Sequence, residues 1–79
     1  MDLDAVHEAM FQHPMVAASN LNGVRSVRVA LPYYCELTGV APDAVADTLV
    51  KLNQRFREQH RVLYRYSVMD DLHYVMVSW

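Results

Sequence analysis

The chain has 79 residues, 53% of them hydrophobic, and a formal net charge of −2 at pH 7. This length fits a single domain over residues 1–79 with one hydrophobic core. The single cysteine, Cys35, excludes an internal disulfide and a cluster of thiolate metal ligands. No apolar run approaches the roughly 20 residues of a membrane span, and acids stand at the N-terminus where a signal peptide would need Lys or Arg. We therefore expect a soluble, intracellular, cytoplasmic protein.

Residues 2–13 predict the first helix. Asp2 or Asp4 can cap its N-terminus, where acids also suit the helix dipole. Pro14 marks the end of the regular run, because the residue before a proline is biased away from helix. The residues MVAAS after it extend this region by another turn, and the Asn22-Gly23 pair then predicts a loop.

The segment from Arg25 to Leu31 has two readings. Its apolar residues alternate with Ser, Arg and Ala, which is the pattern of a strand. The same residues could begin a longer helix that Pro32 would interrupt. We favour a short strand, because Pro32 is well placed as the first residue of a new helix. A full strand from Arg25 to Tyr34 would instead give a sandwich of two helices over a three-stranded sheet.

Two helices separated by a short turn follow. Residues 32–38 form the second, with Gly39 as its left-handed stop, and Pro42 opens the third helix, at about residues 42–59. Apolar residues recur at helical spacing in both, and these predict buried stripes. The stripe residues are Leu31, Tyr34 and Leu37 in the shorter helix and Val45, Leu49, Leu52 and Phe56 in the longer one.

From Arg61 to the end of the chain the pattern of apolar residues changes to a period of two. Residues 61–68 and 72–79 predict two strands joined at residues 69–71, which makes a β-hairpin. The fold class is therefore α+β, with three helices, a short strand and a C-terminal β-hairpin. The order helix, short strand, helix, turn, helix, strand, strand resembles the winged helix-turn-helix superfamily. The sequence GVAPDAVADTLVKL, from Gly39 to Leu52, is similar to its turn and recognition helix. This resemblance implies a winged-helix-like fold that binds DNA or protein.

DNA binding through the third helix is the leading hypothesis, for a small regulatory protein that acts as a dimer. In folds of this kind the recognition helix presents outward side chains to the major groove. Thr48, Lys51 and Arg55 are the expected groove contacts among the outward positions, which also include Asp43, Ala44 and Asp47. Three more cations are expected phosphate contacts: Arg25, Arg28 and Arg57.

The hairpin supplies the argument for the alternative, a protein-protein interaction module (an adaptor or inhibitor) with no nucleic-acid role. Its tip carries Asp70 and Asp71, where a wing that follows phosphates needs Arg or Lys. Both faces of its strands carry apolar residues, more than three short helices can cover, and an uncovered apolar face marks an interface. A homodimer is the simplest form of such an interface. The expected interface residues are Tyr64, Tyr66, Tyr74, Met76 and Trp79.

Metal, cofactor and catalytic sites are not expected. His7 and His13 are six residues apart, which does not place them on one helical face, and His60 and His73 have no ligand partner close in sequence. Cys35 reads as a small hydrophobic residue on a short helix. No phosphate-binding loop or catalytic motif is present, so we expect no enzymatic activity.

Overall fold

The computed structural model describes residues 2–79, with the side chains of residues 59 and 60 left undescribed. Within this range the chain is mixed α+β, with four α-helices, a 3₁₀ turn and a three-stranded antiparallel sheet. The elements in order are α1 (Leu3–Phe11), α2 (Pro14–Leu21), β1 (Ser26–Ala30), α3 (Leu31–Thr38), η1 (Pro42–Ala44), α4 (Val45–His60), β2 (Leu63–Met69) and β3 (Leu72–Ser78).

The sheet has the strand order β1-β3-β2, so the hairpin strand β3 lies in the centre. Ser26–Ala30 is the expected short strand, and it pairs with β3 from Ser26 opposite Ser78 to Ala30 opposite Tyr74. Neither the longer helix nor the full strand to Tyr34 forms, because the helix α3 begins at Leu31, directly before Pro32.

The hairpin turn contains two residues, since Met69 already pairs with Leu72. Asp70 and Asp71 have φ angles of 53° and 62°. Positive φ at both central residues is the geometry of a type I′ turn, whose twist matches that of the flanking strands. Asp is tolerated in this left-handed conformation better than most non-glycine residues, so the acidic tip is also a turn signal.

The helices start and stop largely where local chemistry directs. The Asp2 carboxylate caps α1 by accepting from the Ala5 amide at 3.2 Å, as expected. Gly39 ends α3 with φ of 76°, also as expected. The region after Pro14 differs: it is a full helix of eight residues rather than one added turn, because Pro14 occupies its first turn and His13 caps it. The third predicted helix also begins differently, with its first turn at Pro42 in 3₁₀ form.

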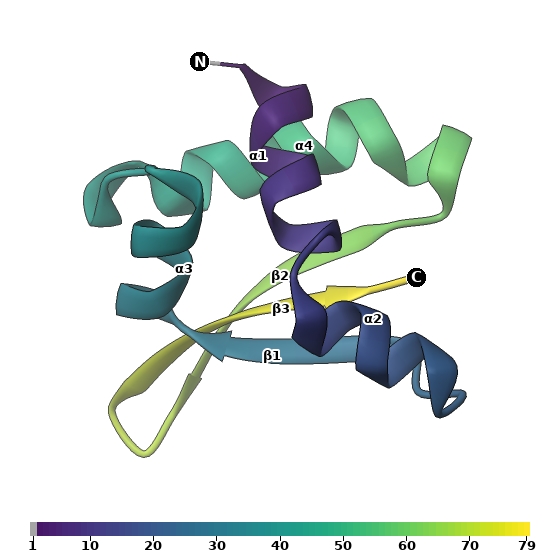
Figure 1. Cartoon of the computed structure of the whole chain (residues 1–79). Coiled ribbons are helices and arrows are strands. Elements are labelled where there is room, and N and C mark those ends of the chain that lie inside the picture. The colour runs from purple at the N-terminus through teal and green to yellow at the C-terminus, as the bar shows by residue number, and fades with distance from the viewer. Residues whose placement is uncertain (1) are drawn as a thin grey trace.

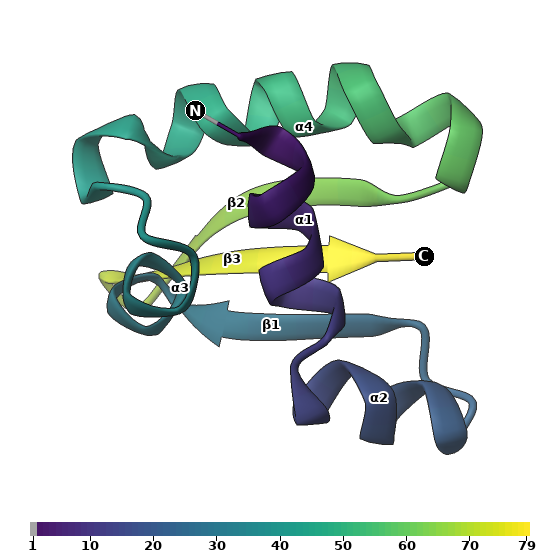
Figure 2. The ribbon, with the colours of Figure 1, turned by 45° about the horizontal axis from the view of Figure 1, so that its top comes forward.

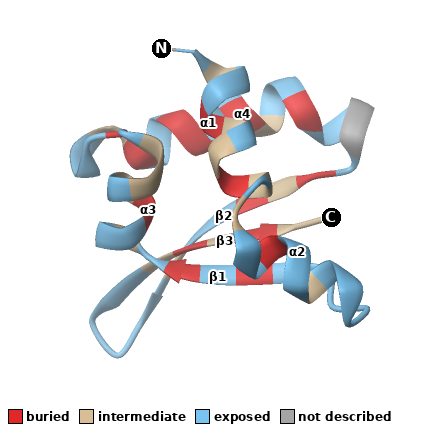
Figure 3. Ribbon diagram, in the orientation of Figure 1, coloured by how far each residue is buried: buried red, intermediate tan, exposed pale blue. Residues whose placement is uncertain are grey.

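The molecule has two layers (Figure 1). The helices all lie on one face of the sheet, where α1 crosses over it, α4 lies along the β2 side and α2 along the β1 side (Figure 2). The core is formed between the layers, and it includes Val27 and Val29 of β1 and Val75 and Val77 of β3. The far half of the hairpin projects beyond the helices and is exposed (Figures 1 and 3).

Candidate functional site

Thr48 is buried, with 2% of its surface exposed, so the expectation that it faces outward is wrong. It lies three residues after Val45 and four before Leu52, and residues at these spacings share one face of a helix. Val45 and Leu52 are both fully buried. The apolar stripe of α4 is therefore wide enough to include Thr48, and this residue is removed from the candidate DNA contacts.

Two of the other expected contacts on α4 are exposed but paired with acids. Lys51 Nζ lies 3.2 Å from the Asp47 carboxylate, one turn earlier in the helix. The Arg55 guanidinium makes a two-pronged contact with Asp4 of α1, at 3.1 and 2.9 Å. Exposed pairs of this kind add little stability. Each of them, however, places a carboxylate beside a cation, and this carboxylate disfavours the DNA phosphate that the cation is expected to bind. Arg57, further along α4, is also exposed.

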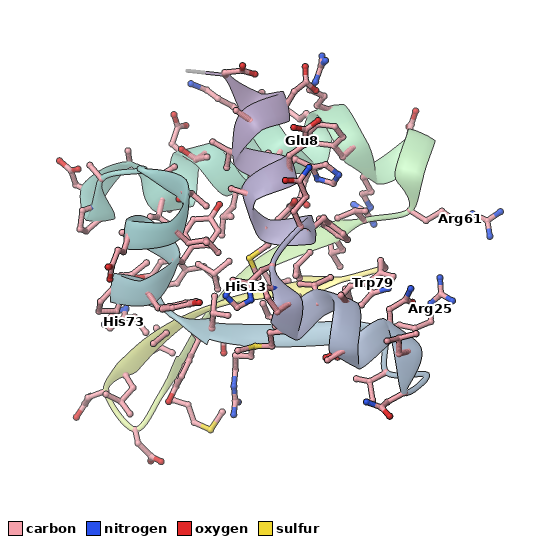
Figure 4. All side chains as sticks on the ribbon, in the orientation of Figure 1. Glu8, His13, Arg25, Arg61, His73 and Trp79 are labelled. Atoms are coloured by element: carbon pink, nitrogen blue, oxygen red, sulfur yellow. The ribbon has the colours of Figure 1, made fainter. Side chains whose placement is uncertain are left out.

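Arg25 and Arg28 belong to the sheet rather than to the helix pair. Arg25 precedes β1 and donates from Nε to the backbone oxygen of Trp79 at 2.9 Å. Arg25 and Arg61 point away from the body at the end opposite the hairpin tip (Figure 4). The guanidinium of Arg28 lies over the Tyr74 ring, 4.8 Å from its centroid, and reaches the Met69 sulfur at 3.9 Å. The expected DNA contacts are thus divided between α4 and the sheet.

The expected interface residues do not form one surface either, because they are divided between the two faces of the sheet. Tyr64 is 2% exposed and its hydroxyl is hydrogen-bonded to His7 Nδ1 at 2.7 Å, so it is a core residue and its assignment to a surface is wrong. Burial raises its pKa, with a smaller contribution from Tyr34. Trp79 packs edge-on against Phe11 at 5.6 Å between ring centroids, on the helix side of the sheet.

Tyr66 is on the helix side of the sheet, opposite Val75, but it is 39% exposed, with its hydroxyl 2.7 Å from His73 Nδ1. Tyr74 and Met76 lie on the opposite face of the sheet. That face, here called the open face, carries no helix and none of its residues is buried. By strand alternation it consists of Ser26, Arg28, Ala30, Leu63, Arg65, Ser67, Met69, Leu72, Tyr74, Met76 and Ser78.

The centre of the open face is a row of three side chains. Met76 of β3 pairs with Arg28 of β1 on one side and with Arg65 of β2 on the other. In the described part of the chain neither arginine makes an ion pair. Arg65 is not among the residues expected from the sequence to bind DNA or a partner. Its place beside Met76 depends on the cross-strand register, and the signal available in the sequence was only its alternation with Tyr64 and Tyr66.

Charge is separated between the two layers. Of the seven cations, Lys51, Arg55 and Arg57 lie on helices away from the strands, while six of the nine acids lie on helices or in the 3₁₀ turn and a seventh, Asp2, caps α1. Four cations are on a strand or within two residues of one, together with the two acids of the hairpin tip. These cations are Arg25, Arg28, Arg61 and Arg65. The helical layer is therefore acidic and the sheet layer basic.

A shallow apolar cavity of about 340 Å³ lies beside the open face, between the start of α3 and the hairpin. Tyr74 lines it and also supports the Arg28 guanidinium, so an apolar recess and a cation share one side chain. The other lining residues are Ala30, Leu31, Pro32, Asp71, Leu72 and His73.

Among the described residues, no three His, Cys, Asp or Glu side chains gather in a way that could hold a metal ion. Within the same residues, none of the helices has the length and apolar character needed to cross a membrane. No protein-family model, curated protein or solved structure matches this chain.

Proposed function

We propose that the domain is a winged-helix-type interaction module that binds an acidic protein segment on its open face. The order of the elements and the strand order β1-β3-β2 support the winged-helix part of this proposal. The row of Arg28, Met76 and Arg65 is the observation that carries the binding part. It combines an apolar centre with two cations that lack carboxylate partners in the described chain.

The chemistry of this row defines the partner. Two guanidinium groups on either side of an apolar side chain match a segment in which Asp or Glu alternates with apolar residues, and Arg suits carboxylates because its planar fork can bind them in a two-pronged manner. The cavity lined by Leu31, Leu72 and Tyr74 would take one apolar side chain of that segment. Burial of such an anchor typically dominates the affinity of a protein interface.

Selection of random peptides displayed on phage against the whole domain tests the proposal. We expect the recovered peptides to combine acids with aromatic or aliphatic residues. The double variant Arg28→Glu/Arg65→Glu should weaken their binding at least about tenfold, because both cations become repulsive. The matched control is Arg57→Glu, which makes the same charge change on α4 and should leave affinity unchanged. Failure to recover such peptides, or binding that ignores the double variant, would contradict the proposal.

DNA binding through α4 is a second candidate, favoured by the helix pair α3 and α4 with its turn at Gly39. Of the cations on α4, Arg57 is exposed and makes no ion pair among the described residues, whereas Lys51 and Arg55 are each paired with an acid. Thr48 is buried and is no longer a candidate contact. Anisotropy titration with random-sequence duplex DNA at low and physiological salt tests it. Binding that falls steeply with salt and is lost in Arg57→Glu would support α4 as the DNA-binding element. No binding at low salt would rule it out.

A further inference from the structure

In the part of the chain that the structure describes, hydrogen bonds cover the outer edge of β2 at one residue, Tyr64. The side-chain amide of Asn53, on α4, donates to the Tyr64 carbonyl at 2.9 Å and accepts from the Tyr64 amide at 2.7 Å. Both backbone groups of Tyr64 therefore point away from β3. Since backbone direction alternates along a strand, those of Tyr66 and Val68 point the same way. In the described chain no strand lies on that side of β2, so these groups form an open edge.

This edge is also accessible and unprotected. Tyr66 and Val68 are 39% and 57% exposed, and the hairpin projects beyond the helices here (Figure 1). Natural edge strands are commonly protected by Lys, Pro or a bulge. The segment from Tyr66 to Val68 contains neither residue, and it pairs with β3 in an unbroken register.

We propose that this edge pairs with the same edge of a second copy of the chain, in antiparallel orientation about a two-fold axis at Ser67. Tyr66 then lies opposite the partner's Val68, and Val68 opposite the partner's Tyr66, so all eight backbone groups of these four residues are satisfied. The two sheets become one sheet of six strands. An aromatic residue opposite a β-branched one is a favourable cross-strand pair.

Charge complementarity favours a second copy of the chain as the partner that pairs with this edge. In this register Arg65 lies opposite the partner's Met69, next to the partner's Asp70. Arg65 makes no ion pair in the described part of the chain, and the hairpin tip is acidic. The two-fold axis repeats this arrangement, so two cation–carboxylate contacts flank the paired strands. Arg65 also belongs to the open face, so an acidic segment bound there would compete with the pairing.

The pairing involves only three residues of each strand, which limits its strength. An interface of this size belongs to the weak and transient class, and we expect a dissociation constant of about 10⁻⁴ M. The whole chain, ¹⁵N-labelled and diluted from millimolar to micromolar concentration, should show amide shifts centred on Tyr66, Ser67 and Val68. Sedimentation equilibrium over the same range should give a monomer–dimer fit.

Val68→Pro is the decisive variant, because it removes one outward amide that does not bond to β3, and an edge strand tolerates proline at such a position. Dimerisation should weaken at least about tenfold. Val68→Thr, which keeps both the amide and the branched side chain, is the matched control and should still dimerise. Should Val68→Pro fail to fold by circular dichroism, Arg65→Glu provides the second test. It sets two acids together in the dimer and should weaken it by a similar factor, with Arg57→Glu unchanged.

A chain that stays monomeric up to millimolar concentration would overturn the proposal. So would a dimer whose concentration-dependent shifts lie on α4 or on β1 rather than along the β2 edge, or one insensitive to both Val68→Pro and Arg65→Glu.

Discussion

Tyr34 is fully buried in the core, and its hydroxyl has no hydrogen-bond partner among the described residues. Tyr64, next to it in the core, is almost equally buried, but its hydroxyl is hydrogen-bonded to His7. An unpaired buried hydroxyl destabilises the folded state, whereas a paired one is close to neutral or favourable. The two tyrosines therefore make a matched pair within one core.

We expect Tyr34→Phe to stabilise the domain by about 1 kcal/mol, because it removes a buried polar group that gains nothing from folding. For a domain of this size this is a rise in melting temperature of about 4–8 °C. Tyr64→Phe is the control and should destabilise by about 1 kcal/mol, since it leaves His7 without this bond. Thermal unfolding followed by circular dichroism measures both. Equal effects would mean that Tyr34 has a partner in solution, such as a buried water.

The same burial makes stability fall at alkaline pH. Burial, and to a lesser extent the neighbouring Cys35, raises the pKa of Tyr34 from 10.0 to about 12. Below pH 10 the Tyr34 phenol is neutral in the folded and in the unfolded state, so the free energy of unfolding is not reduced by its ionisation. Between pH 10 and 12 it ionises only in the unfolded state, so the free energy of unfolding drops by about 1.4 kcal/mol per pH unit. Denaturant midpoints should fall as the pH rises through this range, and they should fall less steeply in Tyr34→Phe. An unchanged slope in this variant would contradict the raised pKa of Tyr34.

At the scale of elements, the side chain of Asn53 joins α4 to the hairpin by hydrogen bonds. Asn53 makes two hydrogen bonds to the Tyr64 backbone, so its amide takes the place of a neighbouring strand. α4 also contacts α1 through the exposed pair of Arg55 with Asp4, which contributes little. The docking of the helix on β2 is thus fixed by apolar packing and by this amide.

Asn53→Ala should destabilise the domain by about 2 kcal/mol, because it leaves the Tyr64 amide and carbonyl unpaired in a partly buried place. Gln54→Ala, an exposed change on the next residue of α4, is the control and should stay within about 0.5 kcal/mol. Urea unfolding provides both values. Native-state hydrogen exchange should also show faster exchange of the Tyr64 amide, and a protected amide in Asn53→Ala would contradict the role assigned to this side chain.

The elements were largely predictable from the sequence, because local signals define them. The alternation over Ser26–Ala30, Gly39 and the acidic turn each specify a backbone conformation. The surfaces were less predictable, because they depend on packing between distant segments. Thr48 looks like an outward residue until α4 is docked, and Tyr64 is assigned to a face only once β2 is paired. The cross-strand neighbours of Met76 likewise depend on a register that no local pattern defines.

At the scale of the whole molecule, two layers enclose a single core and leave one face of the sheet uncovered. The charges follow this division, with an acidic helical layer and basic residues on and around the strands. Val75 and Met76 are neighbours on the central strand and point to opposite faces. Val75 is fully buried under the helices, and Met76 is half-buried on the open face.

This neighbouring pair tests the two-layer architecture in solution. Val75→Ala creates a cavity in the core and should destabilise the domain by about 2 kcal/mol. Met76→Ala shortens a side chain that water already reaches, so it should cost less than about 1 kcal/mol. Urea unfolding of both variants at one low protein concentration makes the comparison. Equal losses would mean that another surface covers the open face even at that dilution, and the open face would then be part of a permanent interface rather than a binding surface. A small loss for Met76→Ala combined with weaker binding of acidic peptides would separate the folding role of β3 from its binding role.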